Sequence, residues 1–130
     1  MILCSGAFDG LHAGHVRYLK AAACLKQPNE ELKVAVAPPD YIQQAKGRTE
    51  YWHQGDRCET VAAVTGVDLA FVYFEADSVA EVIRGLKPRV FVKGMDWAGQ
   101  LPADVIGACA DVGCQIVYVH TPGHHTSEAR

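Results

Sequence analysis

Two histidines stand three residues apart near the start of the chain, in the stretch GAFDGLHAGH that covers residues 6–15. His12 and His15 flank Gly14, and a glycine lets the backbone come close to a bound group. Imidazole N–H groups beside the start of a helix stabilise negative charge, because the helix adds the positive end of its dipole. The spacing therefore indicates a phosphate site in this turn, with both imidazoles directed at one phosphorus atom.

Two other interpretations of this histidine pair stay open. The rings can simply cap and pack the turn, since short motifs often match by chance. They can also bind zinc together with His124 and His125, although the chain has no H-E-x-x-H motif and no C-x-x-C pair. A P-loop and a standard dinucleotide site are disfavoured, because neither G-x-x-x-x-G-K-[ST] nor G-x-G-x-x-G occurs.

The composition is that of an ordinary soluble globular protein, with 130 residues, 49% of them hydrophobic and 21% charged, and a net charge of −3. This length suits a single domain over residues 1–130. The negative charge argues against a nucleic-acid partner, and no apolar run is long enough to span a membrane. Because no basic and apolar leader opens the chain, we expect a cytoplasmic protein.

The cysteines predict no special chemistry. They are odd in number, and none forms a C-x-x-C pair. We interpret them as reduced, mostly buried thiols that pack like small hydrophobic residues. The five are Cys4, Cys24, Cys58, Cys109 and Cys114.

Short apolar runs that alternate with helical patterns must position the histidines. The expected strands cover residues 2–5, 32–37, 69–74, 89–93 and 114–120. The expected helices cover residues 15–25, 56–64, 78–86 and 102–112, the third capped by Asp77 or Ser78. This order predicts an α/β fold, a Rossmann-like α/β/α sandwich with a five-stranded parallel sheet.

Right-handed crossovers place the carboxyl ends of all parallel strands at one edge of the sheet, where ligands bind. We expect the polar segments 8–15, 39–48, 93–97 and 121–127 to meet there. The segment between the second and third strands carries Lys46 and Arg48 and is expected to be a long functional loop. The run 69–74 is almost wholly apolar, so we expect it to be buried on both faces.

Four segments resemble one family in the expected order. GAFDGLHAGHVRYLKAA resembles the signature of the cytidylyltransferase-like nucleotidyltransferases, an H-x-G-H motif after a G-x-F-D turn. PPDYIQQAKGR resembles the substrate loop of that family, and LKPRVFVKGMDW resembles the K-G-x-D segment of bacterial heptose-phosphate adenylyltransferases. TPGHHTSEAR resembles the C-terminal segment that opens the last helix, with His125 where the family usually has serine.

The resemblance implies transfer of a nucleotidyl group from a nucleoside triphosphate to a phosphomonoester, with Mg²⁺ as cofactor and release of pyrophosphate. The catalytic residues would be His12, His15 and Lys46. The nucleotide site would comprise Ala7, Phe8, His12, His15, Lys93, Gly94, Asp96, Thr126 and Ser127. The acceptor site would comprise Asp9, Lys46 and Arg57.

Several points stay open within this resemblance. ATP with a sugar phosphate is favoured, but the DW-A-G residues also resemble the glycerol-phosphate cytidylyltransferases, which use CTP. Asp9 either holds the shape of the loop or lies near Mg²⁺. Relatives of this kind usually form homodimers, so a homodimer is expected. The alternative function is a non-catalytic nucleotide-binding module whose altered C-terminal segment no longer orders the triphosphate.

Overall fold

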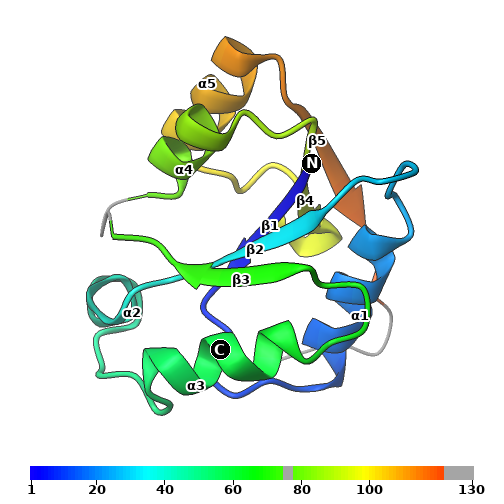
Figure 1. The fold of residues 1–130 in the computed structure, drawn as a ribbon. Helices are drawn as coiled ribbons and strands as arrows, with labels where there is room; N and C mark the ends of the chain where they lie inside the picture. The colour runs from blue at the N-terminus through cyan, green and yellow to red at the C-terminus, as the bar shows by residue number, and fades with distance from the viewer. Residues whose placement is uncertain (75–77, 122–130) are drawn as a thin grey trace.

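The computed structural model describes residues 1–74 and 78–121. It contains one five-stranded sheet in the order β3-β2-β1-β4-β5, and every pair of neighbouring strands is parallel (Figure 1). The strands are β1 (Ile2–Gly6), β2 (Leu32–Val36), β3 (Leu69–Val72), β4 (Val90–Gly94) and β5 (Gln115–Val119). The predicted Rossmann-like architecture is therefore confirmed.

Helices cover both faces of the sheet (Figure 1). α1 (Ala13–Ala23) and α3 (Gln54–Ala62) pack on one face, and α4 (Ala80–Leu86) and α5 (Ala103–Val112) pack on the other. Successive side chains of a strand point to opposite faces, so Ile2 and Cys4 join the core with α1 while Leu3 joins the core with α4 and α5. The sheet is thus buried between two layers.

The sheet opens where its strand order changes direction. β1 pairs with β2 along its whole length, but it pairs with β4 only from Ile2 to Cys4. Beyond that point β1 and β4 separate at their carboxyl ends. Ligands of open α/β sheets bind at such a point.

The segment after β2 is not the long loop that was predicted. It begins with a helix, α2 (Pro39–Lys46), and Gly47 follows in the left-handed conformation with φ of 67°. The sequence carries the signals of this helix, because proline suits the first helical position and glycine the residue after the end. A short 3₁₀ turn, η1 (Met95–Trp97), directly follows β4.

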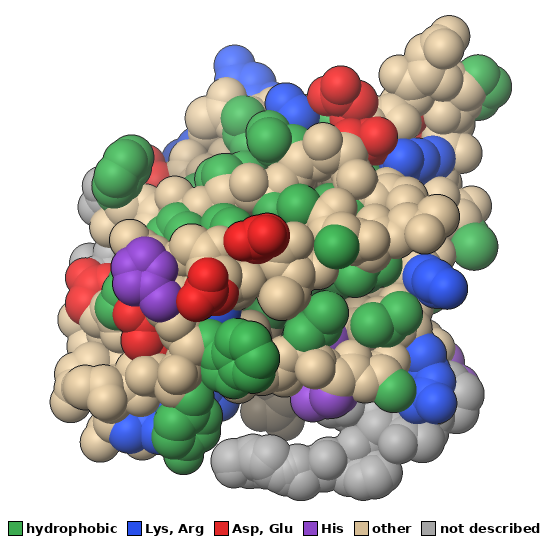
Figure 2. Space-filling model, turned by 60° about the horizontal axis from the view of Figure 1, so that its bottom comes forward, with side chains coloured by type: hydrophobic (Ala, Val, Ile, Leu, Met, Phe, Trp, Pro, Cys, Tyr) green, Lys and Arg blue, Asp and Glu red, His purple; other side chains and the backbone are tan. Residues whose placement is uncertain are grey.

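The prediction that residues 69–74 are buried on both faces was wrong. β3 is an edge strand that ends at Val72, its first residue Leu69 is half exposed, and the Phe74 side chain is 93% exposed. An apolar run reveals a strand, but it does not reveal the position of that strand in the sheet. On the face of the molecule shown in Figure 2, hydrophobic, acidic and basic side chains are interspersed.

Smaller differences concern element ends and caps. α1 begins at Ala13, two residues before the predicted start, so His12 becomes its cap. The N-cap of α4 is Val79, one residue after the predicted Ser78, although Ser78 Oγ accepts a hydrogen bond from Ala80 N at 3.0 Å. Asp77 lies outside the described residues. Cys4, Cys109 and Cys114 are buried free thiols, but Cys24 is exposed.

Among the residues that the structure describes, no helix has the length and apolar character needed to cross a membrane.

Candidate active site

A cleft of about 1050 Å³ lies at the carboxyl edge of the sheet. The β1–α1 turn, α2 and the β4–η1 segment all contribute to its lining. Most of the predicted site residues line it together: Ala7, Phe8, Asp9, His12, His15, Lys46, Lys93, Gly94 and Asp96. Arg57 does not line it, and Thr126 and Ser127 lie outside the described residues.

The histidine pair caps helix α1. His12 Nδ1 accepts from Gly14 N at 3.0 Å, and His15 Nδ1 accepts from His12 N at 3.2 Å. The two rings stack with their centroids 3.8 Å apart and an angle of 25° between them. The capping role that the sequence left open is therefore present, and it holds the rings side by side at the cleft.

This capping fixes the chemistry of the two rings. A neutral imidazole has one acceptor and one donor nitrogen. Since Nδ1 of each ring accepts from the backbone, the neutral form carries its proton on Nε2. Each ring is then a preset N–H donor at the positive end of the α1 dipole, which is the arrangement that stabilises an anion.

The turn before the histidines is shaped by Phe8. This residue has φ of 51°, a left-handed backbone conformation that is unfavourable for residues with a side chain. Its ring packs edge-on against His15 at 5.2 Å and stacks with Tyr18 at 6.4 Å between centroids. A Cβ atom at Gly6 would lie 3.0 Å from the Phe8 ring, so glycine at this position gives the ring its place beside His15.

Lys93 forms part of the floor of the cleft where β1 and β4 separate. Its Nζ donates to Ser5 O at 3.0 Å and to Ser5 Oγ at 3.4 Å, and it lies 4.7 Å from the centroid of the Trp97 ring. Burial lowers the pKa of Lys93 to about 8. Tyr18 completes the floor, because its hydroxyl donates to Val92 O and accepts from Ser5 N at 3.3 Å.

Gly94 and Asp96 follow Lys93 at the end of β4. A Cβ atom at position 94 would lie 2.7 Å from Asp96 Oδ1. Glycine therefore lets the Asp96 carboxylate fold back over the end of the strand and reach the cleft lining.

Asp9 organises the segment between α2 and α3. Its carboxylate accepts from Arg48 Nη1 at 2.7 Å, from Tyr51 N at 2.8 Å and from Trp52 N at 2.7 Å, and its side chain is 3% exposed. Burial alone raises the pKa of Asp9, but these hydrogen bonds outweigh it and hold the pKa below its ordinary value. Of the two predicted roles of Asp9, the structure supports holding the loop shape.

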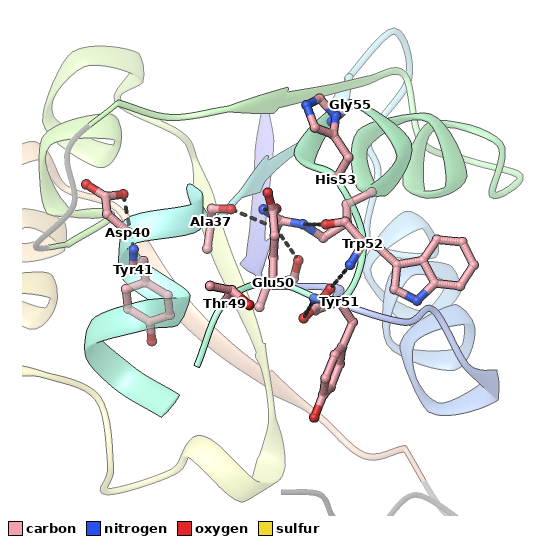
Figure 3. Close-up of polar contacts among 12 residues, drawn as sticks. Ala37, Asp40, Tyr41, Thr49, Glu50, Tyr51, Trp52, His53 and Gly55 are labelled. Carbon is pink, nitrogen blue, oxygen red and sulfur yellow. Dashed lines mark hydrogen bonds and ion pairs between the residues drawn. The ribbon is translucent and has the colours of Figure 1, made fainter. Parts of the chain in front are cut away.

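Arg57 on α3 is fully buried and points inward. It donates to Ala7 O at 2.8 Å, Ala37 O at 2.7 Å, Trp52 O at 3.1 Å and Glu50 Oε1 at 2.7 Å, so it joins the ends of β1 and β2. Figure 3 labels three of these acceptor residues, Ala37, Glu50 and Trp52. Arg57 is therefore outside the cleft lining, and its role in the acceptor site stays a prediction. A contact with an acceptor phosphate would need the guanidinium to leave these four partners.

Lys46 is the last residue of α2, and its exposed side chain lines the cleft. Arg48 beside it is paired with Asp9 and stacks 3.8 Å from the Tyr51 ring centroid. Within the described residues Lys46 forms no ion pair, so its ammonium group is available to an anion in the cleft.

No three His, Cys, Asp or Glu side chains of the described residues come together as a metal site. The zinc interpretation also needs His124 and His125, which lie outside the described residues. The carboxylates in the cleft lining are Asp9, which is occupied by three donors, and Asp96.

Sequence reasoning missed three residues that shape the site. Tyr18 and Ser5 bridge the opening between β1 and β4, and Glu50 pairs with the buried Arg57. Tyr18 carries the one available signal, since a tyrosine on the inner face of a helix usually needs a partner for its hydroxyl. The other two depend on contacts between distant segments.

A profile of the Cytidylyltransferase-like family matches residues 3–129. The chain therefore belongs to the cytidylyltransferase-like family, and its predicted resemblance to that family is confirmed.

Among curated proteins, the chain is similar to the bifunctional protein HldE of Campylobacter fetus, with 35% identity over 101 residues, and of Gluconobacter oxydans, with 36% over 109 residues. These alignments cover 77% and 83% of this chain but only 21% of each relative. The FAD synthase of Pyrococcus horikoshii is 35% identical over 95 residues, 73% of this chain and 62% of that protein. The chain thus spans about a fifth of the HldE proteins.

A solved structure has the same fold along nearly the whole chain. The lipopolysaccharide core biosynthesis protein from Thermoplasma volcanium superposes with a TM-score of 0.72 and 25% identity. The match covers 95% of this chain and 97% of that one.

Proposed function

We propose that this chain is a nucleotidyltransferase, which moves a nucleoside monophosphate from a nucleoside triphosphate to a small sugar or polyol phosphate. The observation that carries the proposal is the stacked pair of His12 and His15 at the start of α1, in one cleft with Lys46 and Lys93. Membership of the cytidylyltransferase-like family supports the same chemistry.

The proposed reaction exchanges one P–O bond for another. An oxygen of the acceptor phosphate attacks the α-phosphorus, and the bond from that phosphorus to the α–β bridging oxygen breaks, so pyrophosphate leaves. The acceptor is already an anion, hence no strong base is needed. The obstacle is repulsion, since two unit charges ~4 Å apart at an effective dielectric constant near 20 repel by about 4 kcal/mol.

The cleft residues fit the task of cancelling this repulsion. The Nε2–H donors of His12 and His15 would bond to the α-phosphate oxygens as their charge grows. Lys46 would hold the acceptor phosphate for in-line attack. Lys93 would supply a second positive charge from the floor of the cleft, next to the nucleotide.

We propose that Mg²⁺ enters with the nucleotide as part of the substrate. The described residues form no cluster of three ligands, and Mg²⁺ in such sites is commonly held by substrate phosphates and water with one or two carboxylates. Asp96 is the carboxylate in the cleft that fits this part, because Asp9 is occupied.

Two observations favour adenine over cytosine as the base. The segment LKPRVFVKGMDW is similar to that of heptose-phosphate adenylyltransferases, and the FAD synthase relative is named for a product that contains adenine. CTP is the second choice. A homodimer, checked by molecular mass in solution, and a cytoplasmic location stay predictions.

The test is a pyrophosphate-release assay with four nucleoside triphosphates and a panel of sugar and polyol phosphates. We expect turnover with ATP and at least one acceptor. His12→Ala and His15→Ala should each lower kcat by about 10²-fold or more, the usual effect of losing a preorganised donor.

His53 provides a matched control for these variants. It caps α3 just as His12 caps α1, with Nδ1 accepting from Gly55 N at 3.0 Å, but it does not line the cleft. His53→Ala should therefore keep kcat within about two-fold while losing the same kind of cap. Equal losses of kcat in all three variants would mean that His12 and His15 only cap the helix. Nucleotide binding by the wild type without turnover would indicate the non-catalytic module.

A further inference from the structure

The cleft is lined by a buried tyrosine whose hydroxyl group has no hydrogen-bond partner among the described residues. Tyr73 follows β3, is 7% exposed and lines the cleft. Its backbone N–H donates to Val36 O at 3.3 Å, but no described group bonds to its phenol oxygen. Polar groups of buried side chains are normally hydrogen-bonded, so this hydroxyl group calls for an explanation.

A second buried tyrosine in the cleft lining shows that the fold can satisfy such a group. Tyr18 is 8% exposed and lines the same cleft, yet its hydroxyl contacts both Val92 and Ser5. The difference lies in position, because Tyr18 bridges two strands whereas Tyr73 stands beyond the end of one. The cleft is therefore where a partner for the Tyr73 hydroxyl would come from.

Apolar side chains pack against the ring of Tyr73. It belongs to one core cluster with Ala37, Val79 and Phe91, which all line the cleft, and Tyr41 packs against this cluster. Burial, with smaller contributions from Tyr41 and Asp40, raises the pKa of Tyr73. The phenol therefore keeps its proton, and it can both donate and accept a hydrogen bond.

We propose that Tyr73 is a specificity-determining residue, which exchanges a hydrogen bond with a hydroxyl group on the carbon skeleton of the acceptor phosphate. The inference rests on the proposed function, in which Lys46 of the same cleft holds the phosphate. A hydroxyl is the matching partner, because it also donates and accepts. The acceptor class is then a sugar or polyol phosphate whose skeleton reaches from Lys46 to the end of β3.

Tyr73→Phe tests this assignment, since it removes one oxygen atom and keeps the ring. The probe is the sugar or polyol phosphate of the panel that gives the highest kcat/KM, together with its mono-deoxy analogues. We expect Tyr73→Phe to lower kcat/KM for this acceptor by about 10-fold and to leave KM for ATP unchanged. Tyr118→Phe, on β5 and outside the cleft lining, should keep the wild-type values.

The deoxy analogues identify the bond itself. One analogue should lose about 10-fold in kcat/KM with the wild type and lose nothing further with Tyr73→Phe, because the two changes remove the same interaction. The Tm measured without substrate distinguishes the two roles, because a structural role of the Tyr73 hydroxyl would lower Tm in Tyr73→Phe. Tyr73→Phe should not lower Tm, whereas Tyr18→Phe, which removes a bonded hydroxyl, should lower it by several degrees.

Each other outcome is decisive. An unchanged kcat/KM in Tyr73→Phe, equal losses with all analogues, or a lower Tm would overturn the assignment of Tyr73 and leave the proposed function standing. Absence of turnover with every acceptor in the wild type would overturn the proposed function and this inference with it.

Discussion

Lys93 shows how a single residue can link burial to the pH dependence of the site. An ammonium group rarely lies in a protein interior without partners, and this one has the Ser5 oxygens and the Trp97 ring. Those partners do not fully replace water, and burial therefore lowers its pKa to about 8. Its positive charge, unlike that of an exposed lysine, is lost in a range where enzymes are assayed.

We therefore predict that kcat/KM for the nucleoside triphosphate falls by up to about 10-fold as pH rises through 8, because the free enzyme then loses one cation from the cleft. Lys93→Arg should move this fall above pH 10, since a guanidinium group keeps its proton. The measurement is the pH profile of kcat/KM between 6.5 and 10. If kcat/KM still falls near pH 8 in Lys93→Arg, then a group other than Lys93 causes the fall.

At the residue scale, the sequence predicted most of the cleft lining but not what each residue does there. His12, His15, Lys46 and Lys93 were placed correctly at the carboxyl edge, because their motifs stand directly after strands. The inward turn of Arg57 was not predictable. It depends on carbonyl groups of Ala7 and Ala37, which only the tertiary structure brings together.

At the scale of elements, the segment 48–52 connects α2 to α3 and forms part of the cleft wall. Two ion pairs fasten it, one between Arg48 and Asp9 and one between Glu50 and Arg57. Figure 3 shows Glu50, Tyr51 and Trp52 on this segment beside Ala37 at the end of β2. The segment thus ties the cleft wall to both central strands.

Asp9→Asn should destabilise the protein by about 2–3 kcal/mol, because an amide has one acceptor oxygen and cannot replace both the ion pair and two backbone hydrogen bonds. Chemical denaturation monitored by fluorescence measures this loss. Asp40→Asn is the matched control. Its exposed carboxylate accepts only from Tyr41 N at 3.1 Å, and its loss should stay near 0.5 kcal/mol. Equal effects would mean that Asp9 does not fasten the segment.

The element predictions failed where position in the fold matters more than local pattern. The periodicity located the five strands and the helices α1, α3, α4 and α5 to within a few residues. α2 was missed although Pro39 and Gly47 mark its ends, because this helix is short and mostly polar and buries only Ile42. The edge position of β3 was missed because strand order is set by the crossovers and not by composition.

At the scale of the whole molecule, the two edges of the sheet differ in their tasks. The carboxyl edge holds the cleft, with its strained Phe8 and buried Lys93. Near the opposite edge, Glu30 makes a bidentate ion pair with Arg89, both bonds at 2.8 Å, and so joins the residues before β2 to those before β4. This ion pair adds stability at the edge that lies away from the cleft.

The pH dependence of the Glu30 ion pair tests whether this pair stabilises the fold without affecting the cleft. Hydrogen bonds from Arg89, which outweigh burial, lower the pKa of Glu30 from 4.5 to about 2. A carboxylate with a lowered folded-state pKa adds stability above pH 4.5, and this stability is lost as pH falls toward 2. Glu30→Gln should therefore lower Tm by several degrees at pH 7, and the difference from wild type should shrink toward pH 2.

The same variant should keep kcat/KM within about two-fold, because Glu30 lies outside the cleft lining. Tm measured from pH 2 to 8, together with one activity assay at pH 7, checks both statements. Glu31→Gln is the control, since its exposed carboxylate makes only a long ion pair of 3.8 Å to Lys33. A large loss of activity in Glu30→Gln would contradict the separation of the two edges.

The capped start of α1 has a consequence for acid. Each imidazole uses the lone pair of Nδ1 to accept from a backbone N–H, and a doubly protonated ring has no lone pair left. An imidazolium would then bring an N–H group against another N–H group. An imidazolium at either position would therefore give up its backbone hydrogen bond, so the intact start of α1 requires a lone pair on Nδ1 of both rings.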